Sequence, residues 1–356
     1  MQKVVTLKDV ASVAGVSLAT ASRVINGHAG VSAQNRAKVE EAIRKLNYSP
    51  NAIARSLATG RTGTISLIIV QEDPIVPTTW SHELPIIQAI HDTVKTQNWE
   101  LQITMCSYRE FRQPSFLPHH LSRGTVDGVL ILSAWLVERH VVAELKAKGL
   151  PFVIIGAHDP DYEAFCVEFD NTEAVRSLVK HLRSEGHETF ALIGGAPDQL
   201  HMEARVQGFV SALQDCGLPI WNQLIEYGDW NVESGYALMQ KLIQRKPRPT
   251  AVICGNDYLA VGAMQAIAES GLRIPEDIAV VGFDDTVVGR VTLPKLTTVR
   301  PPLTQLGRLG AERLVQELVG SAADGDRRVV LPCEVVIRAS SKVQTNQTNQ
   351  KEAYRP

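Results

Sequence analysis

A single arginine stands among short polar side chains near the start of the chain, in the stretch "VSLATASRVING" at residues 16–27. A guanidinium can pair with the N7 and O6 atoms of one guanine, whereas short polar side chains hydrogen-bond phosphate oxygens. Here Arg23 is the candidate for reading a base, and Leu18 and Ala19 offer apolar contact suited to a thymine methyl group. The candidates for holding phosphates are Ser17, Thr20, Ser22 and Asn26.

The charge of the chain is unevenly distributed. Residues 1–62 hold nine Lys and Arg against three Asp and Glu, whereas the whole 356-residue chain has a net charge of −2. A basic N-terminal segment on an acidic remainder indicates a polyanionic partner for that segment alone.

Apolar residues recur at helical spacing three times within residues 1–49. The positions that share a face are Leu7, Val10, Ala11 and Ala14, then Ala21, Val24 and Ile25, then Val39, Ala42, Ile43 and Leu46. Thr6 with Asp9, Ser17 and Ser32 are suitable N-caps, and Gly15 and Gly27 are suitable ends. We therefore expect a three-helix, helix-turn-helix DNA-binding domain that presents Leu18, Ala19 and Arg23 to the major groove.

The segment that follows, residues 50–63, has the composition of a linker with one short helix. Pro50 suits a helix start, and only about two turns fit between it and Gly60, which is less than the roughly 12 to 15 residues that an isolated helix needs. We expect this segment to be ordered only when something else stabilises it.

Short apolar runs alternate with amphipathic stretches from residue 64 to residue 340. The runs are "TISLIIV", "LQITM", "GVLIL", "PFVIIG", "TFALIGG", "TAVICG" and "IAVVGF". Near-continuous apolar strands separated by helices predict an α/β body with doubly wound parallel sheets, and the length fits two of them.

Polar side chains follow several of these strands, where ligands of open α/β sheets bind. Asn256 and Asp257 follow one strand and Asp284 and Asp285 follow another, while Arg205 lies beyond "LIGG". A carboxylate or a guanidinium can hold two vicinal hydroxyls, and an aromatic face such as that of Trp230 can cover a sugar ring. Asp257 and Asp285 could instead cap the helices that follow, and we expect this capping role for both. Trp230 could instead be part of the hydrophobic core.

Signals of catalysis, metal binding and cofactor binding are absent from the sequence. It contains no G-x-G-x-x-G after a strand, no P-loop, no G-x-S-x-G and no HExxH, and its five cysteines form no CxxC pair. We expect no catalytic residue, no metal, no cofactor and reduced cysteines. Without a signal segment or an apolar run of membrane length, a cytoplasmic, nucleoid-associated protein is expected.

The N-terminal sixty residues resemble those of the LacI/GalR family of bacterial transcription regulators. The resemblance rests on "TLKDVASVAGVSLATASRVING" and on "VSAQNRAKVEEAIRKLNYSPNAIARSLATGRTGTISLI". It implies that Leu18, Ala19 and Arg23 set operator preference, that residues 50–63 form a hinge helix in which Leu57 wedges into the minor groove, and that Arg55 contacts phosphate. The whole set expected to contact DNA is Thr6, Leu7, Ser17, Leu18, Ala19, Thr20, Ser22, Arg23, Asn26, Ser32, Tyr48, Asn51, Ala54, Arg55 and Leu57.

Later motifs resemble the effector-binding part of the same family. They are "EARVQGF", "GDWNVESG", "GNDYLAVGAMQAIAESGLRIPEDIAVVGFDDT" and "PKLTTVRPPLTQLG". The resemblance implies a body like a periplasmic sugar-binding protein, with one lobe from residues 64 to 167 and 302 to 328 and the other from 168 to 301 and 329 to 338. It also implies effector contacts from Arg205, Asn256 and Asp284, and it strengthens Trp230, within "GDWNVESG", as a further candidate. The first lobe has "QEDPIVPTTWSHELP" where many relatives have D-x-x-N-P-F-F, which leaves Asp73 and Trp80 as its candidates.

These observations together predict a sequence-specific transcriptional regulator, a repressor of sugar-utilisation genes under allosteric control by a sugar or sugar-like effector. The expected partners are palindromic operator DNA, the effector and a second copy of the chain, with no membrane, because a homodimer matches a palindrome and no leucine heptad precedes the end. Residues 341–356 are polar and are expected to be disordered. One alternative is a sugar-binding transport component or other cytoplasmic sugar-binding protein, and the basic N-terminal segment argues against it. The other is a doubly wound enzyme, and the absence of phosphate-binding loops argues against that.

Overall fold

The computed structural model describes residues 5–25, 30–48, 61–72, 80–121, 125–157, 164–323 and 325–342. These residues divide into an N-terminal unit, the head, which runs to Gly63, and a body that contains nearly all residues from Thr64 onward. Several predicted positions lie outside the described residues, and they are Asn26, Asn51, Ala54, Arg55, Leu57, Asp73 and the tail from residue 343. Only the backbone of Trp80 is described.

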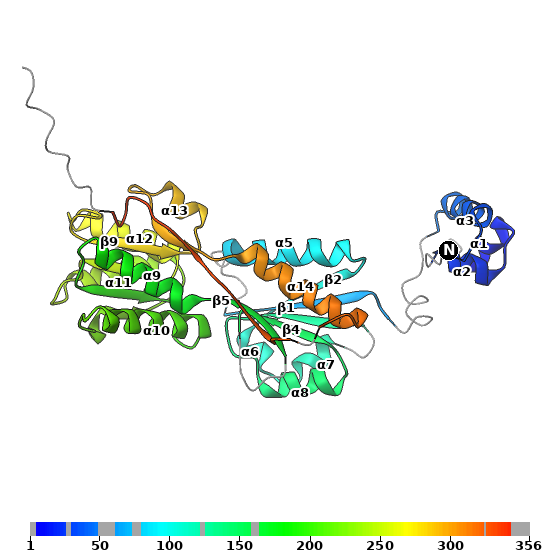
Figure 1. The fold of residues 1–356 in the computed structure, drawn as a ribbon, viewed down its shortest axis with the longest axis horizontal. Helices are drawn as coiled ribbons and strands as arrows, with labels where there is room; N and C mark the ends of the chain where they lie inside the picture. Colours follow the sequence, from blue (N-terminus) through cyan, green and yellow to red (C-terminus); the bar gives the residue numbers. More distant parts are fainter. Residues whose placement is uncertain are drawn as a thin grey trace, which may run out of the picture. The chain divides into compact units, whose positions relative to one another are not determined.

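The head consists of α1 (Leu7–Ala14), α2 (Leu18–Ile25) and α3 (Ala33–Leu46), which confirms the predicted helices (Figure 1). Thr6 and Asp9 form the predicted capping box, in which the Asp9 backbone N–H donates to Thr6 Oγ1 and the Thr6 N–H donates to Asp9 Oδ2. Gly15 ends α1 with a φ of 64°, a conformation that glycine adopts without strain. Apolar side chains from all three helices form one small core.

The first sheet of the body contains six strands in the order β11-β5-β4-β3-β1-β2, with every neighbouring pair parallel. The strands are β1 (Thr64–Gln71), β2 (Glu100–Ser107), β3 (Gly128–Leu132), β4 (Phe152–Ile155), β5 (Phe165–Phe169) and β11 (Arg328–Leu331). Helices α5 (Trp80–Thr96) and α14 (Leu303–Val319) lie on one face. Figure 1 shows α6 (Tyr108–Phe111), α7 (Phe116–His120) and α8 (Arg139–Ala147) on the other face.

The second sheet has the order β12-β10-β9-β8-β6-β7 and is parallel except for β12, which pairs antiparallel with β10. Its strands are β6 (Phe190–Gly194), β7 (Ile225–Tyr227), β8 (Ala251–Cys254), β9 (Ala279–Phe283), β10 (Thr297–Arg300) and β12 (Glu334–Val336). Its helices are α9 (Asn171–Ser184), α10 (Leu200–Asp215), α11 (Val232–Ile243), α12 (Asp257–Glu269), α13 (Val287–Val291) and the 3₁₀ turn η2 (Asn222–Leu224).

Alternate side chains of the second sheet point into different cores, as expected for a sheet covered on both faces. Phe190 and Leu192 face the core that includes α9 and α10, whereas Ala191 and Ile193 face the core that includes α11 and α12. The predicted α/β architecture with doubly wound sheets is therefore confirmed.

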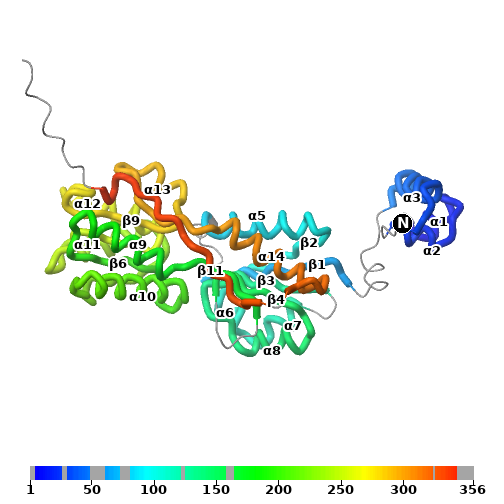
Figure 2. Tube along the Cα trace, viewed as in Figure 1, coloured from blue at the N-terminus to red at the C-terminus, as the bar shows by residue number. Residues whose placement is uncertain are grey.

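The chain passes between the two lobes after β5, after β10 and after β11, as the trace in Figure 2 shows. The last passage corrects the expected boundary, because residues 329–338 were all assigned to the second lobe. Instead β11 pairs with β5 in the first sheet and only β12 joins the second. Only Pro332 and Cys333 separate the two strands, so a segment that looks like one strand in the sequence contributes one strand to each sheet.

Seven strands match the predicted apolar runs, β11 and β12 take the place of the one strand expected near residues 329–338, and β5, β7 and β10 were not predicted. All five cysteines are free, and Cys106, Cys166 and Cys254 are buried. In the described part of the chain, no helix is both long and apolar enough to cross a membrane.

Candidate DNA-reading helix and effector cleft

Helix α2 exposes the side chains that the sequence assigned to base reading. Leu18, Ala19 and Arg23 are exposed, while Ala21 and Val24 are buried against the other helices of the head. Leu18 is 44% exposed, which leaves an apolar side chain available for contact. Sequence periodicity therefore predicted the outward face of α2 correctly.

The other predicted DNA-contacting residues of the head that the structure describes divide into three groups: the capping residues Thr6, Ser17 and Ser32, the partly buried Leu7 and Tyr48, and the half-buried hydroxyl residues Thr20 and Ser22 of α2. Ser17 caps α2 by accepting from the Thr20 backbone N–H at 3.1 Å, and Ser32 caps α3 by accepting from the Asn35 N–H at 3.4 Å. Their hydroxyls lie at helix N-termini, where partial positive charge favours a phosphate. Leu7 and Tyr48 are partly buried against the core of the head, so only part of each side chain is available for DNA.

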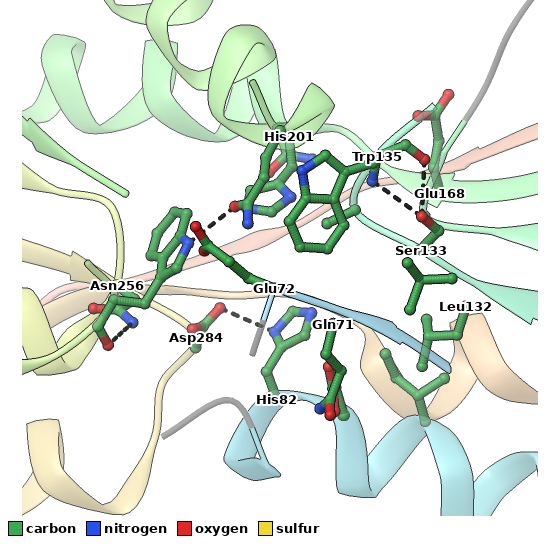
Figure 3. Close-up of a pocket in the computed structure, with 18 of the residues that line it drawn as sticks. Gln71, Glu72, His82, Leu132, Ser133, Trp135, Glu168, His201, Asn256 and Asp284 are labelled. Atoms are coloured by element: carbon green, nitrogen blue, oxygen red, sulfur yellow. Dashed lines mark hydrogen bonds and ion pairs between the residues drawn. The ribbon is translucent and has the colours of Figure 1, made fainter. Parts of the chain in front are cut away.

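A cavity of about 460 Å³ lies between the two lobes of the body (Figure 3). Its walls are formed where β1, β3 and β5 of the first sheet and β8 and β9 of the second sheet end. This is the position at which open α/β sheets bind ligands. Four predicted effector residues, Arg205, Trp230, Asn256 and Asp284, line it together.

Arg205 is the buried cation of this cleft. It is 4% exposed, its Nε donates to Asn171 Oδ1 at 2.8 Å, and its Nη1 donates to the carbonyl oxygen of Gly255. Its guanidinium also lies 3.7 Å from the centre of the Phe283 ring. Burial lowers the pKa of Arg205 to about 10, against the opposing effect of Asp284, so the side chain stays charged at neutral pH. These contacts hold the guanidinium rigidly at the cavity wall.

Asp284 connects the two lobes. It follows β9 with a φ of 100°, and its Oδ1 lies 3.2 Å from Nδ1 of His82 on α5. Figure 3 shows the two side chains facing each other across the cleft. Burial opposes ionisation of Asp284, but His82 and Arg205 outweigh it and lower the pKa of this carboxyl. Asp284 is thus an ionised hydrogen-bond acceptor, suited to the hydroxyls of a ligand.

Trp230 lies flat against two glycines at the ends of β6 and β8. A methyl group built on Gly195 would lie 1.9 Å from the Trp230 ring, and one built on Gly255 would lie 2.9 Å from it. Trp230 Nε1 donates to Gln199 Oε1 at 2.9 Å, and the ring centre lies 5.3 Å from that of His201. Because the ring lines the cavity, it can serve as an aromatic platform as well as a packing element.

Asn256 lines the cavity, but its amide is occupied within the protein. Its Oδ1 caps α12 by accepting from the Leu259 N–H at 2.8 Å, and its Nδ2 donates to the Trp230 carbonyl at 3.2 Å. These contacts make Asn256 a residue that positions Trp230.

The expected capping role of Asp257 and Asp285 is wrong. Asn256 caps α12, and Thr286 is the cap residue of α13. Asp257 is buried and accepts hydrogen bonds from Thr286 and Thr298. Asp285 pairs with Arg290, Arg300 and Arg338. Sequence could not show this, because the partners of Asp257 and two of the three partners of Asp285 come from positions distant in the chain.

The first-lobe wall contains residues that sequence analysis missed. They are Gln71, Glu72, His82, Glu83, Ser133 and Trp135. His82 and Glu83 lie within the stretch quoted above, only two and three residues after Trp80, but their helical position was not recognised there. Trp135 stacks on Tyr108 with ring centres 5.0 Å apart. No group of His, Cys, Asp and Glu suited to a metal ion occurs among the described residues.

Two further contacts join the lobes beside the cavity. Trp135 Nε1 donates to Asp198 Oδ2 at 3.3 Å, and the Leu200 N–H donates to the Ala134 carbonyl at 2.9 Å. With His82 and Asp284, these contacts hold the lobes together around the cleft.

Comparison with known proteins supplies the family. Residues 6–51 match the description "Bacterial regulatory proteins, lacI family", and residues 179–341 match "Periplasmic binding protein-like domain". The chain is 31% identical to catabolite control protein A of Priestia megaterium over 95% of this chain and 99% of that one. It is 33% identical to the transcriptional regulator CelR of Thermobifida fusca, over 94% and 98% of the two chains.

Solved structures agree with this assignment. The lac repressor dimer bound to operator and the anti-inducer ONPF has a TM-score of 0.82 at 29% identity, with 96% of this chain and 100% of that chain covered. The complex of the regulator CelR with cellobiose has a TM-score of 0.70 at 31% identity, with coverages of 94% and 99%. The relatives of this chain are named as regulators and repressors, which agrees with the expectation that the chain is not an enzyme. The chain therefore belongs to the lacI family of bacterial regulatory proteins, and its function is transcriptional regulation through a helix-turn-helix head.

Proposed function

We propose that this protein is a homodimeric repressor of sugar-utilisation genes that binds a palindromic operator and responds to a sugar or sugar-like effector. The observation that carries the proposal is the cavity between the lobes, where a buried guanidinium, an ionised carboxylate and an indole face one space. This combination suits a hydroxylated ring, because Arg205 and Asp284 offer paired donors and acceptors and Trp230 offers an apolar face. The cellobiose and operator complexes of the relatives support the same reading.

The route from effector to DNA begins at the lobes. A ligand that contacts both walls changes the free energy of the His82–Asp284 and Trp135–Asp198 contacts, and with it the angle between the lobes. We propose that this angle sets the separation of the hinge segments, residues 50–63, in the two subunits. A hinge that is only marginally helical responds to a coupling free energy of about 1–3 kcal/mol, equivalent to a change of roughly 5- to 150-fold in affinity.

The proposal also covers the domains, the place of action and the roles of residues in the head. The domains are residues 1–49 for DNA binding, 50–63 for the hinge, 64–340 for effector binding and dimerisation, and 341–356 as a tail. The place of action is the cytoplasm, on the nucleoid. In the head, Arg23 reads a base while Ser17 and Ser32 hold phosphates at helix N-termini.

The test starts from selection of operator sequences by the purified protein from a randomised duplex pool. A palindromic consensus is expected, and fluorescence anisotropy with that duplex then measures affinity while mono- and disaccharides are added. A sugar that changes operator affinity at least fivefold supports the proposal. A consensus without twofold symmetry contradicts the homodimeric reading, and unchanged affinity with every sugar contradicts the effector reading.

A further inference from the structure

Gln71 and Glu83 form a corner of the cleft on the first-lobe side. Gln71 is the last residue of β1 and is only 3% exposed, although it lines the cavity (Figure 3). Its Nε2 donates to Glu83 Oε2 at 2.7 Å. Its Oε1 is buried and has no hydrogen-bond partner among the described residues. A buried acceptor without a donor is destabilising, so this oxygen favours a ligand that brings a donor.

The charges around the cavity point to the kind of donor. The carboxylates that line it are Glu72, Glu83, Glu168, Asp229 and Asp284. Among the described lining residues, Arg205 is the one guanidinium and no lysine occurs, while the imidazoles are His82 and His201. Burial and the neighbouring Arg205 lower the pKa of His201 well below its usual value, so His201 is neutral. Carboxyl groups therefore outnumber cationic groups among the described lining residues, which favours a cationic ligand over a phosphate or a carboxylate.

The carboxylates differ in how they are paired. Glu168 accepts from Arg328 at 2.6 Å, and Asp284 contacts His82. Glu83 forms no ion pair with a described residue, and its hydrogen bond comes from the uncharged amide of Gln71. Burial raises the pKa of Glu83 to about 7, against the opposing effects of His82 and Gln71. A cation beside Glu83 would stabilise its ionised form, which burial alone disfavours.

We propose that the Gln71–Glu83 corner binds the protonated amino group of the effector, which is then an amine-bearing polyol such as an amino sugar. An ammonium group has three donors and no acceptor, so it can donate to Gln71 Oε1 and to the Glu83 carboxylate together. The hydroxyls of the same ligand face Arg205 and Asp284 on the opposite wall. This inference rests on the proposed function, because it names the chemical class that the effector cleft accepts.

The experiment is isothermal titration calorimetry on the full chain with matched sugars. The pairs are glucosamine and glucose, galactosamine and galactose, and mannosamine and mannose, and the anionic probes are glucose 6-phosphate and glucuronate. We expect the amino member of at least one pair to bind at least tenfold more tightly than its hydroxyl counterpart, and both anionic probes to bind more weakly than glucose.

The Glu83→Gln variant tests the corner itself, because it removes the charge and keeps the shape and the acceptor of the Gln71 bond. The amino preference is expected to fall to threefold or less in this variant, with circular dichroism and the melting temperature reporting that it is folded. The matched control is Glu203→Gln on the exposed face of α10, outside the cavity lining, which keeps the preference. A preference that survives Glu83→Gln, equal binding within every pair, tighter binding of an anionic probe, or no binding by any amino sugar overturns the inference. Neutral sugars that bind and change operator affinity would leave the proposed function standing while overturning this inference.

Discussion

Replacing Gly195 by alanine tests whether Trp230 is a platform for the effector. The added methyl group would lie 1.9 Å from the indole, whereas ordinary contact begins at 3.4 Å, so the ring must move away. This movement disrupts the bond from Trp230 Nε1 to Gln199, worth about 1 kcal/mol, and the contact with His201, worth roughly 0.5–1.5 kcal/mol. A total of about 1–3 kcal/mol also matches the usual cost of overpacking.

Two measurements follow from that magnitude. The melting temperature of the body is expected to fall by several degrees, since about 1 kcal/mol corresponds to roughly 2–4 °C in a domain of this size. The dissociation constant of an effector found by thermal-shift screening is expected to rise tenfold or more, because about 1.4 kcal/mol corresponds to a factor of ten.

Gly194→Ala is the control for Gly195→Ala. Its methyl group would lie 2.8 Å from the end of the Met202 side chain and 3.1 Å from the Tyr227 ring, and neither residue lines the cavity, so effector affinity should change little. Unaltered effector affinity in Gly195→Ala, together with a lowered melting temperature, would show that Trp230 is a packing residue only.

Three further predictions concern the head and the core. Arg23→Ala should relax preference at one base pair of each half-site, with a loss of about 1–3 kcal/mol of discrimination, and an unchanged preference in a panel of operator variants would remove Arg23 from base reading. Operator affinity should fall steeply as salt rises from 50 to 200 mM, and a flat salt dependence would argue against phosphate contacts from the basic head. Asp257 has a pKa raised from 3.8 to about 7, mainly by burial, so the folded state holds a proton that the unfolded chain has released between these values. The free energy of unfolding of the wild type should therefore decrease between pH 5 and pH 7, relative to Asp257→Asn, by about 2 kcal/mol. A difference in unfolding free energy between the two proteins that is the same at both pH values, measured by urea denaturation, would contradict this.

The sequence was most informative where structure is local. Helix α1, its capping box and the turn at Gly15 follow from residues within a few positions of one another, and the exposed face of α2 follows from the burial of Ala21 and Val24. The apolar runs also predicted the strands that are buried on both faces. Such strands need apolar side chains at every position, because helices cover both faces of a doubly wound sheet.

The sequence was least informative where a group depends on distant partners. Strand β12 is short and only partly buried, and its place beside β10 is visible only in the fold. Asp285 resembles a cap by position, yet its partners include Arg300 and Arg338. On the first-lobe wall, nothing in the sequence around Glu83 marks it as a binding residue. Its candidacy follows from its contact with Gln71 in the folded chain.

The central claim is that occupation of the interlobe cleft controls the affinity of the head for DNA. The most direct test is the operator affinity of the wild type and of Asp284→Ala, measured by anisotropy over a titration of an effector that binds the wild-type cleft. The account predicts a change of at least fivefold in the wild type, within the usual range of allosteric coupling of about 5- to 150-fold, and loss of this response in Asp284→Ala. An operator affinity that stays constant while calorimetry shows the wild-type cleft filling would contradict it.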